Sequence, residues 1–149
     1  MCIRDRLETG RRAEAIAALE TALEMARREP LVVNPPMLHA VHRLGRRGDL
    51  LDVVAAMPDT PWAHAARCWT SGDARGAADV FAALELVPTA EARARLDAGH
   101  DFAAAGRQDE ADVELRRAIE LYRPLRARRY LAKAEALLSS EGAATAQPG

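Results

Sequence analysis

Residues 99–122 read GHDFAAAGRQDEADVELRRAIELY, two helix-favouring runs on either side of Gly106. Counted from this glycine, Ala111, Leu115 and Ala118 stand at offsets of 5, 9 and 12. The offsets differ by four and three, so the three residues lie on one face of a helix. Small and large residues alternate on that face, which lets a neighbouring helix approach closely. The stretch therefore predicts two packed helices joined at a glycine turn.

The same spacing begins at three earlier glycines, Gly10, Gly45 and Gly72, and the successive intervals up to Gly106 are 35, 27 and 34 residues. Each of the four units has an apolar residue at all three offsets. In chain order these residues are Ala15, Leu19, Ala22, Leu50, Val54, Met57, Ala77, Phe81, Leu84, Ala111, Leu115 and Ala118. A repeat of this period is typical of helical arrays, which offer surfaces to partners rather than sites for chemistry.

This pattern resembles the tetratricopeptide repeat, in which a glycine turn joins helices A and B of a unit of about 34 residues. The last unit matches best, because Gly99 and Phe102 also fit the family's first helix. The second unit is shorter, and Gly48 competes with Gly45 for its turn. The resemblance implies an all-α fold over residues 7–138. The expected architecture is a right-handed superhelical array of antiparallel helix pairs, with about three and a half repeats.

The two ends of the chain differ from this repeat region. Residues 1–6 read MCIRDR, which back-translates into DNA that resembles the end of a transposon adapter used in sequencing libraries. The implied codons are unexpected in a gene that encodes 21 basic residues with Lys133 as the one lysine. We therefore expect an artefact here, with a natural start as the alternative, and a chain that is the C-terminal fragment of a longer protein. Residues 139–149 are polar and small, which predicts a disordered tail.

The first repeat begins halfway, so its helix near 11–28 is expected to lack a neighbour. Three apolar residues on one face of that helix, Ile16, Leu19 and Leu23, would then be uncovered. Exposed apolar patches of this kind promote association. The sequence therefore predicts that the isolated chain self-associates through these residues.

The composition agrees with an all-helical protein, because aromatic residues, which favour strands, make up only 4% of the chain. The net charge is −1, two cysteines give no disulfide framework, and no apolar run is long enough to span a membrane. These features predict a cytoplasmic protein. The predicted helices lie near 11–28, 36–46, 49–57, 61–71, 74–86, 89–105, 108–123 and 125–140.

Motifs that carry chemistry are scarce. The sequence has no phosphate-binding glycine-rich loop, no dinucleotide fingerprint and no His-Glu-x-x-His pair, so no catalytic residue and no cofactor are predicted. His39 and His42 stand three apart, and His64 and Cys68 stand four apart, so each pair offers two metal ligands. Neither pair has a clear third ligand, and no metal site is predicted. Cys68 as a nucleophile has no evident base.

Charged residues suggest solvated surfaces. Asp and Glu alternate with arginine, as on the exposed face of a helix, so paired-carboxylate catalysis is not indicated. A basic cluster surrounds the last helix junction and offers contacts to nucleic-acid phosphate as an alternative to a solvated helix end. Its members are Arg123, Arg126, Arg128, Arg129 and Lys133. The overall charge is slightly acidic, and we expect no nucleic-acid partner.

The tetratricopeptide resemblance implies that helix A of each unit lines a concave surface. Tryptophan and arginine, both present on these helices, are favoured contact residues at interfaces. The alternative for Trp62 is the buried tryptophan position of the family's helix A. The predicted partner-binding groove consists of His39, His42, Arg43, Trp62, Trp69, Arg93 and His100.

Three segments near the C-terminus, 94–96, 103–112 and 129–138, resemble the ending of large bacterial signalling ATPases. In those proteins a helical-repeat tail follows an ATPase domain, often behind a class III adenylate or guanylate cyclase domain. The resemblance implies a noncatalytic regulatory scaffold that binds a protein partner or its own upstream ATPase domain. Two alternatives remain, a fragment of a cyclase or of a transcriptional activator whose catalytic or DNA-binding domain is missing.

Overall fold

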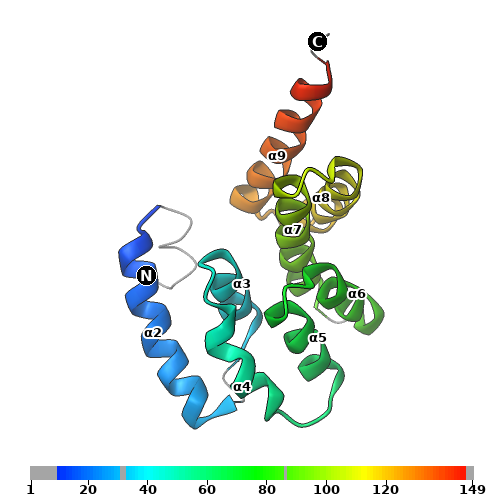
Figure 1. Cartoon of the computed structure of the whole chain (residues 1–149). Coiled ribbons are helices and arrows are strands. Elements are labelled where there is room, and N and C mark those ends of the chain that lie inside the picture. Colours follow the sequence, from blue (N-terminus) through cyan, green and yellow to red (C-terminus); the bar gives the residue numbers. More distant parts are fainter. Residues whose placement is uncertain (1–9, 31–32, 86, 147–149) are drawn as a thin grey trace.

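The computed structural model describes residues 10–30, 33–85 and 87–146, with side chains up to residue 138. Within these ranges the chain is all-helical and has no strand, which confirms that the fold is all-α. The helices form a row with α2 and α9 at its two ends (Figure 1). They are α2 (Arg12–Arg28), α3 (Pro35–Arg43), the 3-10 helix η2 (Arg47–Leu50), α4 (Leu51–Ala55), α5 (Pro61–Thr70), α6 (Ala74–Leu84), α7 (Pro88–Ala104), α8 (Gln108–Tyr122) and α9 (Arg128–Ala146).

The glycines that open the four sequence units all have positive φ angles, +74° at Gly10, +69° at Gly45, +97° at Gly72 and +76° at Gly106. Glycine adopts this left-handed conformation without the steric cost that a Cβ atom adds. At the last three glycines the same two hydrogen bonds close the preceding helix. The glycine N–H bonds to the carbonyl three residues earlier, and the next N–H bonds to the carbonyl five residues earlier.

The short second unit departs from its predicted helix near 49–57. The chain there forms the 3-10 helix η2 followed by the five residues of α4. Gly48 lies inside η2, so Gly45 is the turn residue of this unit. Pro58 disfavours helical backbone at the residue before it, which agrees with the early end of α4.

Polar caps fix several helix starts. The side chains of Asn34, Thr60 and Asp73 each accept a hydrogen bond from the backbone N–H three residues ahead, at 3.0, 3.1 and 2.8 Å. The first two caps are followed by proline in the first helical turn, as the sequence predicts. α7 begins directly at Pro88 without a side-chain cap.

The repeated apolar face forms the core. All four residues at offset 5 are 0% exposed, and the four at offset 9 are at most 2% exposed. α7 contributes to both hydrophobic clusters, with Ala90, Ala94 and Ala98 in the first and Leu96 in the second. It approaches α8 closely at Gly99, where an added Cβ atom would lie 2.6 Å from Cγ of Leu115. The small residues of α7 therefore allow helices to pack on nearly all of its sides.

The predicted uncovered stripe on α2 is wrong. Leu19 and Leu23 are 0% and 1% exposed, and Ile16 is partly buried against the same cluster. The face belongs to the same buried cluster as Val33 and Met37, which follow it in the chain. The exposed stripe that motivated self-association through these residues is absent from the described part of the molecule.

At the other end, the backbone of α9 stays helical to Ala146. The helix therefore extends into the segment from Ser139 that the sequence predicts to be a disordered tail. Residues 147–149 lie outside the described ranges, as do residues 1–6 of the predicted adapter segment. No helix in the described part of the chain has the length and apolar character needed to cross a membrane.

Candidate functional site

A carboxylate lies at the centre of the molecule, where α3, α5 and α7 meet. Asp97 of α7 is 0% exposed. It accepts a hydrogen bond from the indole N–H of Trp69 on α5 at 3.0 Å, and Nδ1 of His39 on α3 lies 2.9 Å from it. Burial alone raises the pKa of a carboxyl group, but here the charge and hydrogen bond of His39, with the charges of His42 and Arg43, lower it. Asp97 is therefore a buried anion held chiefly by its contacts with His39 and Trp69.

The same geometry fixes the ring of His39. An ionised carboxylate only accepts hydrogen bonds, so Nδ1 of His39 carries the proton that it donates to Asp97. The ring also meets Tyr130 of α9 edge-on, with centroids 6.3 Å apart. His39 thus links residues of three helices that are far apart in the sequence.

A second histidine–carboxylate pair lies one turn away. Nε2 of His42 on α3 is 2.6 Å from Oδ2 of Asp101 on α7. Burial lowers the pKa of His42, but the hydrogen bond to Asp101 and the charges of Asp97 and Asp101 outweigh it, so the pKa is raised. The charge of Arg47 opposes this rise. His42 therefore gains affinity for its proton when α3 packs against α7.

A cavity of about 320 Å³ lies beside these pairs, between α3, α7 and α9. Positive charges from Arg43 and Lys133 face it, together with His100 and an apolar wall. The pKa of His100 is lowered by burial and by the charge of Arg43, which Asp101 and Asp97 only partly offset. The cavity is lined by His39, Arg43, Leu96, Asp97, His100, Lys133, Ala136 and Leu137. Its shape and charge make it the best candidate for a binding site.

Three of the seven predicted groove residues, His39, Arg43 and His100, come together at this cavity. His42 lies next to them on α3, but its side chain is 6% exposed and is bonded to Asp101. The structure therefore brings predicted residues of the second unit together with His100 of the fourth.

The predicted placement on an open groove is wrong for Trp69 and Arg93. Trp69 is 0% exposed, and its indole N–H is used by the buried Asp97. Arg93 is 7% exposed, and its guanidinium carbon lies 5.2 Å from the ring centroid of Tyr130. Trp62 is partly buried elsewhere, 5.7 Å from the ring of Phe81, which agrees with the alternative of a core position.

No family model matches this chain, and no curated protein or solved structure is significantly similar to it. The function must therefore be argued from the residues of the chain itself.

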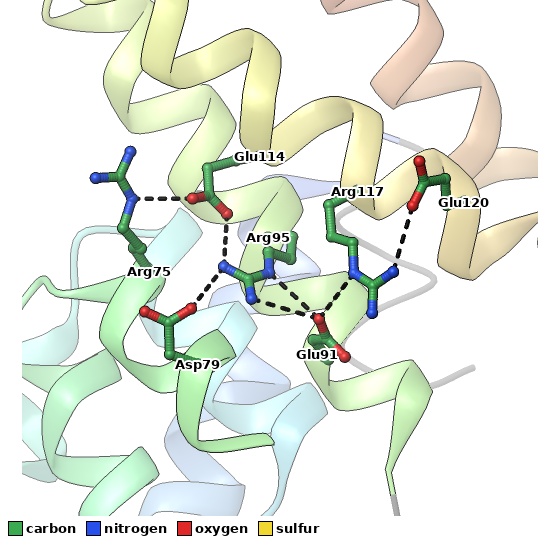
Figure 2. Close-up of polar contacts among 7 residues, drawn as sticks. All are labelled: Arg75, Asp79, Glu91, Arg95, Glu114, Arg117 and Glu120. Atoms are coloured by element: carbon green, nitrogen blue, oxygen red, sulfur yellow. Dashed lines mark hydrogen bonds and ion pairs between the residues drawn. The ribbon is translucent and has the colours of Figure 1, made fainter. Parts of the chain in front are cut away.

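Carboxylates away from the cavity form a network of ion pairs with arginines (Figure 2). Glu114 contacts Arg75 and Arg95, each at 2.9 Å, and Glu91 contacts Arg95 at 3.4 Å and Arg117 at 3.3 Å. The side chains of Glu91 and Glu114 are only 6% and 4% exposed. The prediction of a solvated face is therefore wrong for these two glutamates, which are buried where α6, α7 and α8 pack together.

The remaining candidates from the sequence are the His64–Cys68 pair, the metal-ligand pairs and the basic cluster. Nε2 of His64 lies 4.0 Å from Sγ of Cys68, and burial, followed by the charge of Asp73, raises the pKa of the Cys68 thiol. Such a thiol is less reactive than a free one. The part of the chain that the structure describes holds no group of three or more metal-ligand side chains. All five residues of the basic cluster near the last junction are exposed.

Asp97 is not among the predicted site residues, although the sequence carries a signal for it. Asp97 stands four residues after Arg93 and three before His100, so all three share one face of the predicted helix. An acidic residue between two predicted site residues on one helical face indicates a polar cluster. Its partners on α3 and α5 could not be read from this spacing.

Proposed function

We propose that the chain is a noncatalytic helical-repeat module, a tetratricopeptide-like array, that binds a protein partner around the cavity between α3, α7 and α9. The observation that carries this proposal is the gathering of charged side chains from three helices at one cavity of about 320 Å³. The identical hydrogen-bonded turns at Gly45, Gly72 and Gly106 support the repeat character. Such arrays typically use extended surfaces to hold partners.

The cavity favours binding over catalysis. Its lining residues include no hydroxyl or thiol group that would serve as a nucleophile. Two of its acid–base groups, His39 and Asp97, are paired with each other, and Asp97 also accepts a hydrogen bond from Trp69. A general acid or base exchanges a proton with a substrate, whereas the proton between His39 and Asp97 is held in a structural pair.

We further propose that the partner is another protein or an upstream ATPase domain of the same protein, as in the bacterial signalling ATPases whose endings this chain resembles. Sequencing the source DNA upstream of codon 7 tests whether the chain is part of a larger signalling ATPase. The proposal predicts an open reading frame that continues into a nucleotide-binding loop. A ribosome-binding site directly before Met1 would contradict it, and measurable ATP binding by the purified chain would contradict the noncatalytic role.

Site-directed photo-cross-linking in the source cells tests the binding face. A photoreactive residue replaces Leu137, which lines the cavity, and in a second strain it replaces Val113, which is 63% exposed on α8. We expect one defined protein to be cross-linked from position 137 and not from position 113. Cross-linking to the same proteins from both positions, or none from position 137, would refute the proposed face.

A further inference from the structure

The cavity between α3, α7 and α9 contains an arginine that makes no hydrogen bond or ion pair with the described residues. Among the described residues, the guanidinium of Arg43 makes no hydrogen bond and no ion pair, although the residue is partly buried and lines the cavity. The ring nitrogens of His100 also lack a hydrogen-bond partner there. A partly buried arginine is normally paired, because its planar fork of N–H groups loses hydration on burial. Arg43 therefore has donors available for an acceptor inside the cavity.

The charge of Arg43 is not neutralised by an ion pair with the described residues that line the cavity. Asp97 is the one carboxylate among the lining residues. The negative charge of Asp97 is already engaged by Trp69 and His39. The remaining field at the cavity therefore favours an anion.

The other wall of the cavity is apolar. Leu96 of α7 and Ala136 and Leu137 of α9 line it. Small-molecule sites combine such a wall with a few placed polar groups, and their volumes begin at about 300 Å³. The cavity here, at about 320 Å³, is of that size.

We propose that this cavity binds a small organic anion, with a carboxylate or phosphate group against Arg43 and its apolar part against Leu96, Ala136 and Leu137. The guanidinium of Arg43 matches the two oxygens of either group. Lys133 is exposed and also lines the cavity. This inference goes beyond the proposed function, because such a ligand binds the chain alone and makes the cavity a candidate effector site.

The charge of Arg43 gives the site a spectroscopic signature. That charge contributes to the lowered pKa of His100, while His42, Asp97 and Asp101 act on the same ring. An anion bound between Arg43 and His100 offsets the positive charge and favours the protonated ring. Binding is therefore expected to raise the pKa of His100 and to strengthen as this histidine gains its proton.

NMR titration of the 149-residue chain tests the proposal with three probes. Benzoate and phenyl phosphate carry an anion on an apolar ring, and benzamide presents the same ring without charge. We expect at least one anionic probe to shift the resonances of His100 in a saturable way and to raise its pKa. That probe should bind about tenfold more tightly than benzamide, because hydrogen bonds to charged groups are the stronger ones. The two anions distinguish a carboxylate ligand from a phosphate ligand.

The matched variants are Arg43→Gln at the cavity and Arg116→Gln on α8, where the side chain is 70% exposed. Arg43→Gln removes no hydrogen bond or ion pair, so the fold is retained, which the spectrum of the free variant checks. It should weaken the anionic probe about tenfold, equivalent to about 1.4 kcal/mol, while Arg116→Gln leaves the affinity unchanged. Absence of anion binding, equal binding of benzamide, or equal affinity in both variants would overturn the proposal. None of these outcomes depends on the cross-linked protein partner.

Discussion

The guanidinium of Arg95 joins α6, α7 and α8 through three carboxylates. It lies 2.9 Å from Asp79, 2.9 Å from Glu114 and 3.4 Å from Glu91, and its side chain is 12% exposed. Removal of one partner from a buried ion pair costs about 3–5 kcal/mol, because the other charge stays buried. In this network Glu114 keeps Arg75 and Glu91 keeps Arg117. Because each buried glutamate keeps one arginine, we expect Arg95→Met to cost less than a fully broken pair. The free energy of unfolding should fall by about 2–3 kcal/mol.

Urea unfolding followed by circular dichroism measures this change. With a slope of about 2 kcal/mol per molar urea, Arg95→Met should move the midpoint down by about 1 M or more. Arg117→Met is the matched control, since its side chain is 48% exposed and its pairs are worth at most about 1 kcal/mol. If Arg95→Met changed the free energy of unfolding by less than about 0.5 kcal/mol, or no more than Arg117→Met does, the network would not stabilise the packing of α6, α7 and α8.

Three further predictions concern the helix packing. Gly99→Ala places a Cβ atom 2.6 Å from Leu115, so overpacking should lower the free energy of unfolding by about 1–3 kcal/mol; a thermal transition at the wild-type temperature would contradict this. Gly106→Ala should cost about 1 kcal/mol through its positive φ alone, whereas Gly48→Ala, where φ is not positive and the space is open, should cost nothing; equal costs would refute the turn assignment. The raised pKa of His42 means that its contribution is complete below the unfolded pKa and is lost as pH rises through the folded pKa. His42→Gln should therefore destabilise the chain more at about pH 6 than at about pH 8 in urea unfolding, and an equal loss at both values would contradict the pairing with Asp101.

The fold class and most helix positions could be predicted because their signals are local. The last three glycine turns have a positive φ and are closed by hydrogen bonds to residues within the preceding helical turn. The caps at Asn34 and Thr60 likewise act over three residues. The burial of the apolar face of α2 could not be predicted in this way. Leu19 and Leu23 are buried in one cluster with Val33 and Met37, and the hydrophobic pattern does not say which neighbours cover a face.

The candidate site was only partly accessible from the sequence. Helical spacing predicts that Arg93 and His100 share a face, but the contact between His39 and Asp97 spans 58 residues and depends on how the helices stack. Trp69 illustrates a second limit. A tryptophan is favoured both in cores and at interfaces, and only a buried acceptor such as Asp97 shows which role its N–H group has. The arginine–carboxylate network could not be predicted either, because the spacing of charged residues does not show which of them are buried.

Cross-linking from position 137 in the Arg43→Gln background tests most directly whether the cavity between α3, α7 and α9 is the functional surface. Both residues line the cavity, and Arg43 makes no hydrogen bond or ion pair in the described part of the chain. We expect the protein captured from position 137 in the unsubstituted chain to be lost, or strongly reduced, in this variant while its circular dichroism spectrum is unchanged. Undiminished capture would contradict the assignment, because it would show that the partner binds without the charge on which the cavity depends.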